Sequence, residues 1–151
     1  MNRTEDSVFG TLNFDGNWEK TEELKFYTRT YQIKVIVETF EKMDILDTQR
    51  EAYKLYEHNL SHYIEKVPEV LLEYYKSNYN EIAKYNKIPE SVNYENVTKE
   101  LVVKLIKMKS VYFNRKGEFG WLCDCSWDNE NGISIILSGE KPFVEEYDYL
   151  I

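Results

Sequence analysis

The sequence predicts a single α+β domain in which about three helices pack on one face of a mainly antiparallel sheet. Alternation of apolar and polar residues is typical of strands and occupies both ends of the chain, whereas helical periodicity occupies the middle. The length of 151 residues is ordinary for one domain, so we expect residues 1–151 to form a single unit. Strands, helices and more strands in that order favour an α+β arrangement over alternating βαβ units.

The N-terminal strands are predicted from alternation and turn residues. Residues 8–14 have the pattern of a short strand, and residues 15–17 (Asp-Gly-Asn) form a turn signal. Residues 18–28 can supply the partner strand of a hairpin. Apolar residues then occupy alternate positions through residues 31–37, which is the clearest strand pattern in this half of the chain.

Two amphipathic helices are predicted next. Asp47 is a suitable N-cap for a helix that continues to about Lys66, with its apolar residues on one stripe. Proline is tolerated in the first turn of a helix, so Pro68 is expected to begin a second helix that ends near Asn86. The two helices are expected to pack as an antiparallel pair.

A third helix and a C-terminal meander complete the prediction. Asn96 or Thr98 can cap this helix, which is expected to end near Lys109. Strand patterns separated by turn residues follow, which predicts a meander of about four strands on an antiparallel sheet. The predicted strands cover residues 111–114, 118–127, 133–137 and 143–150.

Charge and composition indicate the class of partner. The net charge of -8 opposes attraction to nucleic acid and to anionic membranes. The same charge favours encounter with a basic protein, and the 13 tyrosines and three tryptophans are residue types that often anchor interfaces. We therefore expect a protein partner, with no nucleic acid, no membrane and no cofactor; composition leaves the oligomeric state open.

The N-terminus and the cysteines favour a cytoplasmic location. The first residues are polar, and no apolar run approaches the ~20 residues of a membrane helix. Trp121, Cys123, Cys125 and Trp127 lie on the same face of a predicted strand, because side chains two residues apart point to the same side. All four are therefore expected in the core. Both cysteines are expected to be reduced and metal-free, while Leu122 should lie on the solvent-facing side.

The histidines are the first candidates for chemistry. His58 and His62 are four residues apart, as two metal ligands on one helix face would be. Asn59 stands where a zincin-type protease has its glutamate, and both histidines lie opposite the apolar stripe. Since they should face outward while Cys123 and Cys125 face inward, a joint zinc site is disfavoured and no metal site is expected.

Carboxylates are the second group of candidates. They could form glycosidase-like or nuclease-like pairs, but their spacing selects no pair. No G-x-G-x-x-G, P-loop or G-x-S-x-G motif is present, so the sequence predicts no catalytic residue. We expect an acidic patch on the C-terminal meander that binds a basic partner. Its predicted binding residues are Asp124, Asp128, Glu130, Glu145, Glu146 and Asp148.

Two segments carry a resemblance to a group of bacterial domains of unknown function. Residues 9–12 (Phe-Gly-Thr-Leu) match an opening F-G-x-L strand, and residues 127–132 (Trp-Asp-Asn-Glu-Asn-Gly) match a terminal W-D-x-E-x-G hairpin turn. The layout of most of the chain is similar to these domains. The group resembles immunity-like proteins of bacterial toxin systems, which block a toxin by binding it. The resemblance implies a binding role and supplies no catalytic residue.

Two hypotheses for function follow. The leading hypothesis is a protein-binding domain of the immunity type that neutralises a toxin by direct binding. The alternative is a small hydrolase whose carboxylate or histidine residues converge only in the folded chain. Buried carboxylates close together in a cleft would favour the hydrolase, whereas a convex or shallow acidic face with exposed tyrosines would favour the binding domain.

Overall fold

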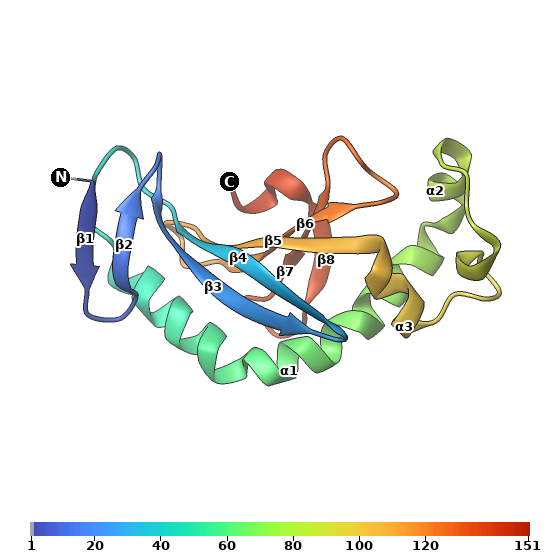
Figure 1. Ribbon diagram of the computed structural model, residues 1–151, viewed down its shortest axis with the longest axis horizontal. Helices are drawn as coiled ribbons and strands as arrows, with labels where there is room; N and C mark the ends of the chain where they lie inside the picture. The colour runs from blue at the N-terminus through green and yellow to red at the C-terminus, as the bar shows by residue number, and fades with distance from the viewer. Residues whose placement is uncertain (1) are drawn as a thin grey trace.

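The computed structural model describes residues 2–151, in which eight strands form one sheet and a long helix crosses it (Figure 1). The strands lie in the sheet in chain order, and every neighbouring pair is antiparallel except β4 and β5. The predicted α+β class and the mainly antiparallel sheet are therefore confirmed. The strands are β1 (Arg3–Asp6), β2 (Gly10–Phe14), β3 (Trp18–Phe26), β4 (Arg29–Val37), β5 (Ile106–Phe113), β6 (Phe119–Cys125), β7 (Ile133–Ile136) and β8 (Phe143–Glu146).

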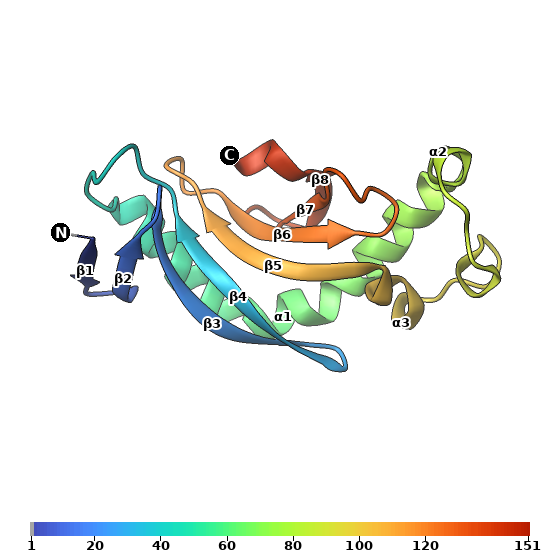
Figure 2. The ribbon, with the colours of Figure 1, turned by 45° about the horizontal axis from the view of Figure 1, so that its top comes forward.

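The helices occupy the crossover between β4 and β5. They are α1 (Asp47–Ser77), α2 (Tyr79–Tyr85) and α3 (Lys99–Val102), and α1 alone covers the sheet face, with α2 and α3 near its C-terminal end (Figures 1 and 2). Because the chain leaves β4 and returns to β5 through these helices, the two strands run parallel. No helix within residues 2–151 is long and apolar enough to cross a membrane.

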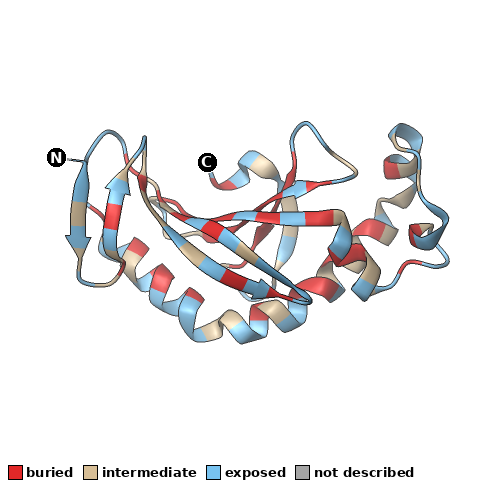
Figure 3. Ribbon diagram, viewed as in Figure 1, coloured by how far each residue is buried: buried red, intermediate tan, exposed pale blue. Residues whose placement is uncertain are grey.

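Pro68 lies inside α1 instead of starting a second helix, so the predicted antiparallel helix pair is wrong. The buried stripe of α1 continues without interruption through Tyr63, Val67 and Leu71 on either side of this proline. Packing of that stripe against the sheet offsets the backbone hydrogen bond that proline removes. Figure 3 shows buried residues recurring along the length of the helix.

The start of α1 also differs from the prediction. Asp47 is the first helical residue, and Leu46 occupies the capping position. The cap is made by Gln49, whose side-chain oxygen accepts the Leu46 N–H at 3.0 Å. The amide of Gln49 donates to the carbonyl oxygens of Glu38 at 2.9 Å and of Phe113 at 3.2 Å. This fully buried residue thus ties the helix start to the ends of β4 and β5.

The largest differences in strand boundaries are at three places. β5 begins at Ile106, so the predicted third helix is reduced to α3 and a 3₁₀ turn. Thr98 caps α3 as predicted, and its side-chain oxygen accepts a hydrogen bond from the Leu101 N–H at 3.2 Å. β1 was not predicted, because Arg3–Asp6 is polar and is held as a strand by pairing with β2. At the other end, β8 stops at Glu146 and Tyr147–Leu150 forms a 3₁₀ segment, named here the C-terminal 3₁₀ segment.

Aromatic side chains fill the space between α1 and the sheet. Trp121 is fully buried, and its indole N–H donates to the Tyr56 hydroxyl at 3.0 Å. Burial raises the pKa of Tyr56, so this hydroxyl stays protonated at neutral pH. The largest fully buried side chains of this core are Trp121, Tyr53, Tyr56, Tyr75, Phe9, Phe26, Phe113 and Phe119.

A second, smaller core lies on the opposite face of the sheet. Leu122 was predicted to face solvent, but it is buried together with Tyr112, Ile136 and Leu150. The correction has a simple cause: the C-terminal 3₁₀ segment folds over this part of the sheet and covers it. Alternation along β6 placed Leu122 on the correct face of the sheet. The burial of that face by the C-terminal 3₁₀ segment was not predicted.

Candidate binding surface

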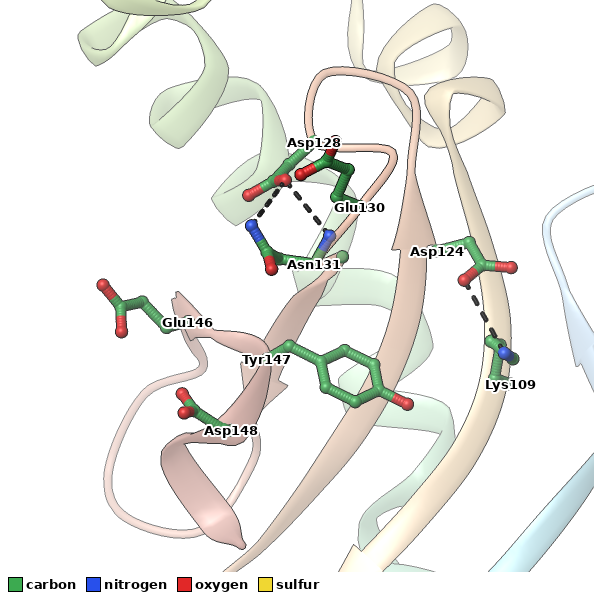
Figure 4. A pocket seen from close by; sticks show the side chains of 9 residues that line it. Lys109, Asp124, Asp128, Glu130, Asn131, Glu146, Tyr147 and Asp148 are labelled. Atoms are coloured by element: carbon green, nitrogen blue, oxygen red, sulfur yellow. Dashed lines mark hydrogen bonds and ion pairs between the residues drawn. The ribbon is translucent and has the colours of Figure 1, made fainter.

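Five of the six predicted binding residues lie around one open hollow of about 640 Å³ (Figure 4). Asp124 comes from β6, Asp128 and Glu130 come from the β6–β7 turn, and Glu146 and Asp148 come from the end of β8 and the C-terminal 3₁₀ segment. We call this surface the acidic hollow. Its lining residues are Lys109, Asp124, Asp128, Glu130, Asn131, Gly132, Glu146, Tyr147 and Asp148.

The β6–β7 turn shapes one side of the acidic hollow. The Asp128 carboxylate accepts hydrogen bonds from the backbone and the side-chain nitrogen of Asn131, each at 3.2 Å. The Gly132 N–H donates to the Asp128 carbonyl at 2.9 Å, and Gly132 has a φ of 73°. A Cβ at residue 132 would lie 2.3 Å from the Cys123 carbonyl oxygen and 3.0 Å from the Tyr147 ring. Only glycine fits this position without a shift of its neighbours.

Negative charge dominates the acidic hollow. Five carboxylates and a single lysine, Lys109, are among its lining residues. The Lys109 ammonium lies 3.8 Å from the Asp124 carboxylate in a largely exposed pair. Such exposed pairs contribute little to stability, so the Asp124 carboxylate stays available to a partner. Burial raises the pKa of Tyr147, and the negative charge of Asp124 raises it further, so Tyr147 stays protonated and adds a neutral aromatic wall.

Glu145 is the predicted binding residue that lies outside the acidic hollow. It lines an adjoining hollow of about 210 Å³ together with Tyr74 and Trp127, and Asp128, Gly132 and Glu146 line both hollows. The acidic surface is also concave, whereas the sequence suggested a patch. The sequence left open whether Tyr147 lies at the rim of the acidic surface or packs inward, and the structure places it in the lining. Lys109 and Asn131 were missed as lining residues, and for Lys109 the cause was its assignment to the end of a helix instead of to β5.

Trp127 does not lie in the core with Trp121. It is half-buried beyond the end of β6, with its ring centroid 5.2 Å from that of Tyr75 and 6.4 Å from that of Tyr74. The side chain of Asn86 donates to the Trp127 carbonyl at 3.2 Å. The strand ends at Cys125, so the alternation that placed Trp127 inward no longer applies.

The other candidate groups do not converge. His58 and His62 are exposed on α1, as predicted, and Cys123 and Cys125 are buried and unpaired. Within residues 2–151, no group of three or more His, Cys, Asp or Glu side chains is placed to hold a metal ion.

We expect both cysteine thiols to react slowly with a disulfide reagent while the protein is folded. Burial raises the pKa of the Cys123 and Cys125 thiols, so little thiolate forms at neutral pH and the reagent has no direct access. The labelling rate should rise steeply in denaturant, which provides the control. Fast reaction of both thiols in the folded protein, or stoichiometric zinc by elemental analysis, would contradict this assignment.

A family model matches most of the chain. The model of the family described as "Domain of unknown function (DUF6985)" matches residues 8–149. No curated protein and no solved structure matches the chain.

Proposed function

The chain belongs to the family described as "Domain of unknown function (DUF6985)", and for this member we propose a protein-binding function of the immunity type, in which the domain neutralises a toxin by direct binding. The observation that carries the proposal is the acidic hollow, where five carboxylates from separate segments gather on one open surface. The partner is a bacterial toxin domain with a basic surface, and the two meet in the cytoplasm.

Electrostatics supports a basic partner. Complementary charge steers diffusional encounter and excludes partners of the wrong sign. A nuclease-like toxin carries basic groups where it binds phosphates, so its active-site surface is the kind of surface that the acidic hollow would attract. Asp124, Glu130 and Glu146 are exposed, and an open surface of this kind favours a binding domain over a hydrolase.

The first experiment identifies the partner. The candidates are the product of the neighbouring gene and the proteins captured by this domain from its native host. A captured protein supports the proposal only if it is toxic when expressed alone and is neutralised when this domain is co-expressed. A domain that leaves the toxicity of its captured partner unchanged would contradict the immunity function.

We expect reversal of two charges in the acidic hollow to weaken binding. Glu146→Lys with Asp148→Lys should slow association by about tenfold or more at low salt. Association of the parent protein should slow as salt rises, and the variant should lose most of this dependence. Asp128 is left intact, because its carboxylate holds the β6–β7 turn. Association rates at several salt concentrations give the measurement.

A matched control reverses two exposed charges elsewhere. Glu57→Lys with Glu65→Lys makes the same net change on α1, outside the acidic hollow. This control should associate nearly as fast as the parent. If the folded Glu146→Lys, Asp148→Lys variant bound as tightly and as fast as the parent, the contact surface would lie elsewhere, and the outer face of α1 with His58 and His62 would be tested next.

A further inference from the structure

We propose that the partner adds an extended, basic segment to the free edge of β8 and places an arginine or lysine side chain in the hollow beside Trp127. This inference rests on the proposed function, because it takes the partner to be a protein with a basic surface. It goes further by naming the mode of binding and a second contact site, which lies next to the acidic hollow.

The edge of β8 is open to strand addition. β8 is the last strand in the sheet order, and its residues pair with β7 alone among the residues that the structure describes. Its four residues, Phe-Val-Glu-Glu, contain no proline or lysine, while Lys141 and Pro142 come directly before the strand. The shielding of this edge is therefore limited to its short length, its two glutamates and these two flanking residues. Main-chain groups at such an edge can pair with an extended segment, and pockets for alternate side chains then give specificity.

Two hollows form one groove between the helices and β8. Figure 1 shows β8 beside the C-terminal half of α1, and a hollow of about 700 Å³ lies between them, with Val70, Phe143 and Val144 in its lining. The second is the hollow of about 210 Å³ that contains Trp127. Tyr74 and Asn78 line both hollows, so the two are contiguous along β8.

The hollow beside Trp127 fits a cationic side chain. Aromatic rings and carboxylates line it together, and no lysine or arginine is among its lining residues. Aromatic faces attract cations, and a carboxylate can accept two hydrogen bonds from a guanidinium group. The Tyr85 ring already has the Lys84 ammonium 5.5 Å from its centroid. The residues that would make the contact are therefore Tyr74, Trp127, Glu81, Glu145 and Glu146.

The other end of the groove fits an apolar side chain. Its charges have both signs, as in the pair of Lys66 and Glu69 at 3.5 Å, and Phe143 is 38% exposed. Side chains on one face of a strand repeat every ~7 Å, so one extended segment can reach both ends of the groove. The occupant is therefore an extended segment with a basic residue and an apolar residue on the same face.

Synthetic peptides test this mode of binding. The probe is an acetylated, amidated octapeptide in which threonine alternates with arginine in one half and with valine in the other. Two further peptides carry N-methyl groups on one or the other alternate set of residues, because only one set of N–H groups can face β8. A fourth peptide has glutamate in place of arginine. Calorimetry gives affinities, and hydrogen exchange reports the amides of residues 143–146.

The arginine peptide is expected to bind and to protect the amides of β8 from exchange. Only one of the two N-methylated peptides should lose binding, and the glutamate peptide should bind about tenfold or more weakly. The Glu81→Lys, Glu145→Lys variant should bind the arginine peptide about tenfold or more weakly than the parent protein does. The Glu57→Lys, Glu65→Lys control should bind it with the affinity of the parent protein. The proposal is overturned if the arginine peptide does not bind, if both N-methylated peptides bind as well as their parent, or if β8 stays unprotected.

The outcomes separate this inference from the proposed function. If the toxin is neutralised and its binding depends on the acidic hollow, while β8 stays unprotected in the complex, only strand addition fails. If the peptide binds at β8 as described but no toxin is neutralised, the immunity function fails and the groove remains a binding site for basic segments.

Discussion

Replacing Trp121 by alanine is expected to destabilise the domain by about 4 kcal/mol, the largest loss that we expect from a single truncation. The ring is completely buried and packs edge-on against Phe26, with ring centroids 5.6 Å apart, and its N–H donates to Tyr56. Alanine would leave a cavity and would also leave the buried Tyr56 hydroxyl without this donor. The shift of the denaturant midpoint at unchanged slope measures the loss.

Two variants separate volume from hydrogen bonding at this site. Trp121→Phe keeps most of the ring and loses the N–H, so its loss should be clearly smaller than that of Trp121→Ala. Trp127→Ala should also be milder, since Trp127 is half-buried at the end of the sheet. An equal loss of stability from Trp127→Ala and Trp121→Ala would show that the two tryptophans do not differ in packing as the structure indicates.

Gly132→Ala is expected to have the second largest effect, about 3 kcal/mol. Its positive φ disfavours any side chain, and the new Cβ would meet the Cys123 carbonyl oxygen and the Tyr147 ring. Relief requires β6, the turn or Tyr147 to move, and all of these border the acidic hollow. Thermal or chemical unfolding measures the stability change, and partner affinity should fall in the same variant.

Gly16→Ala is the matched control for this change. Gly16 has a φ of 81°, close to the 73° of Gly132, and a Cβ there would meet nothing within 4 Å. The control therefore measures the backbone penalty alone, which we expect to be about 1 kcal/mol. Equal losses in Gly16→Ala and Gly132→Ala would mean that the close contacts around Gly132 relax freely.

Local sequence patterns, such as alternation along a strand and turn residues, predicted the parts of the fold that depend on neighbouring residues. Alternation along residues 119–125 placed Trp121 and Cys123 on the face toward α1 and Asp124 on the other, and the structure confirms both. The turn residues around residues 128–132 marked the β6–β7 connection correctly. The acidic hollow could be anticipated for the same reason, since most of its carboxylates belong to adjacent segments of one meander.

Features decided by packing over long distances could not be predicted from local patterns. Pro68 has the sequence signature of a helix start, yet the buried stripe on both sides of it keeps α1 continuous. Leu122 alternates onto the outer face, and it is buried because a segment more than twenty residues later covers it. β1 has a polar sequence, and its strand conformation comes from pairing with β2. In each case, a partner distant from the residue decides its environment.

The parallel pairing of β4 with β5 requires a contact between distant parts of the chain during folding. Strands β1 to β4 and strands β5 to β8 each form hairpins between close neighbours, which can form early. Joining the two halves brings residues 34–37 against residues 110–113, and this contact must close the loop that contains α1. Until β4 and β5 pair, each of them has an unpaired edge in addition to the β1 and β8 edges that remain in the folded sheet. We therefore expect the chain to be most prone to aggregation in this interval.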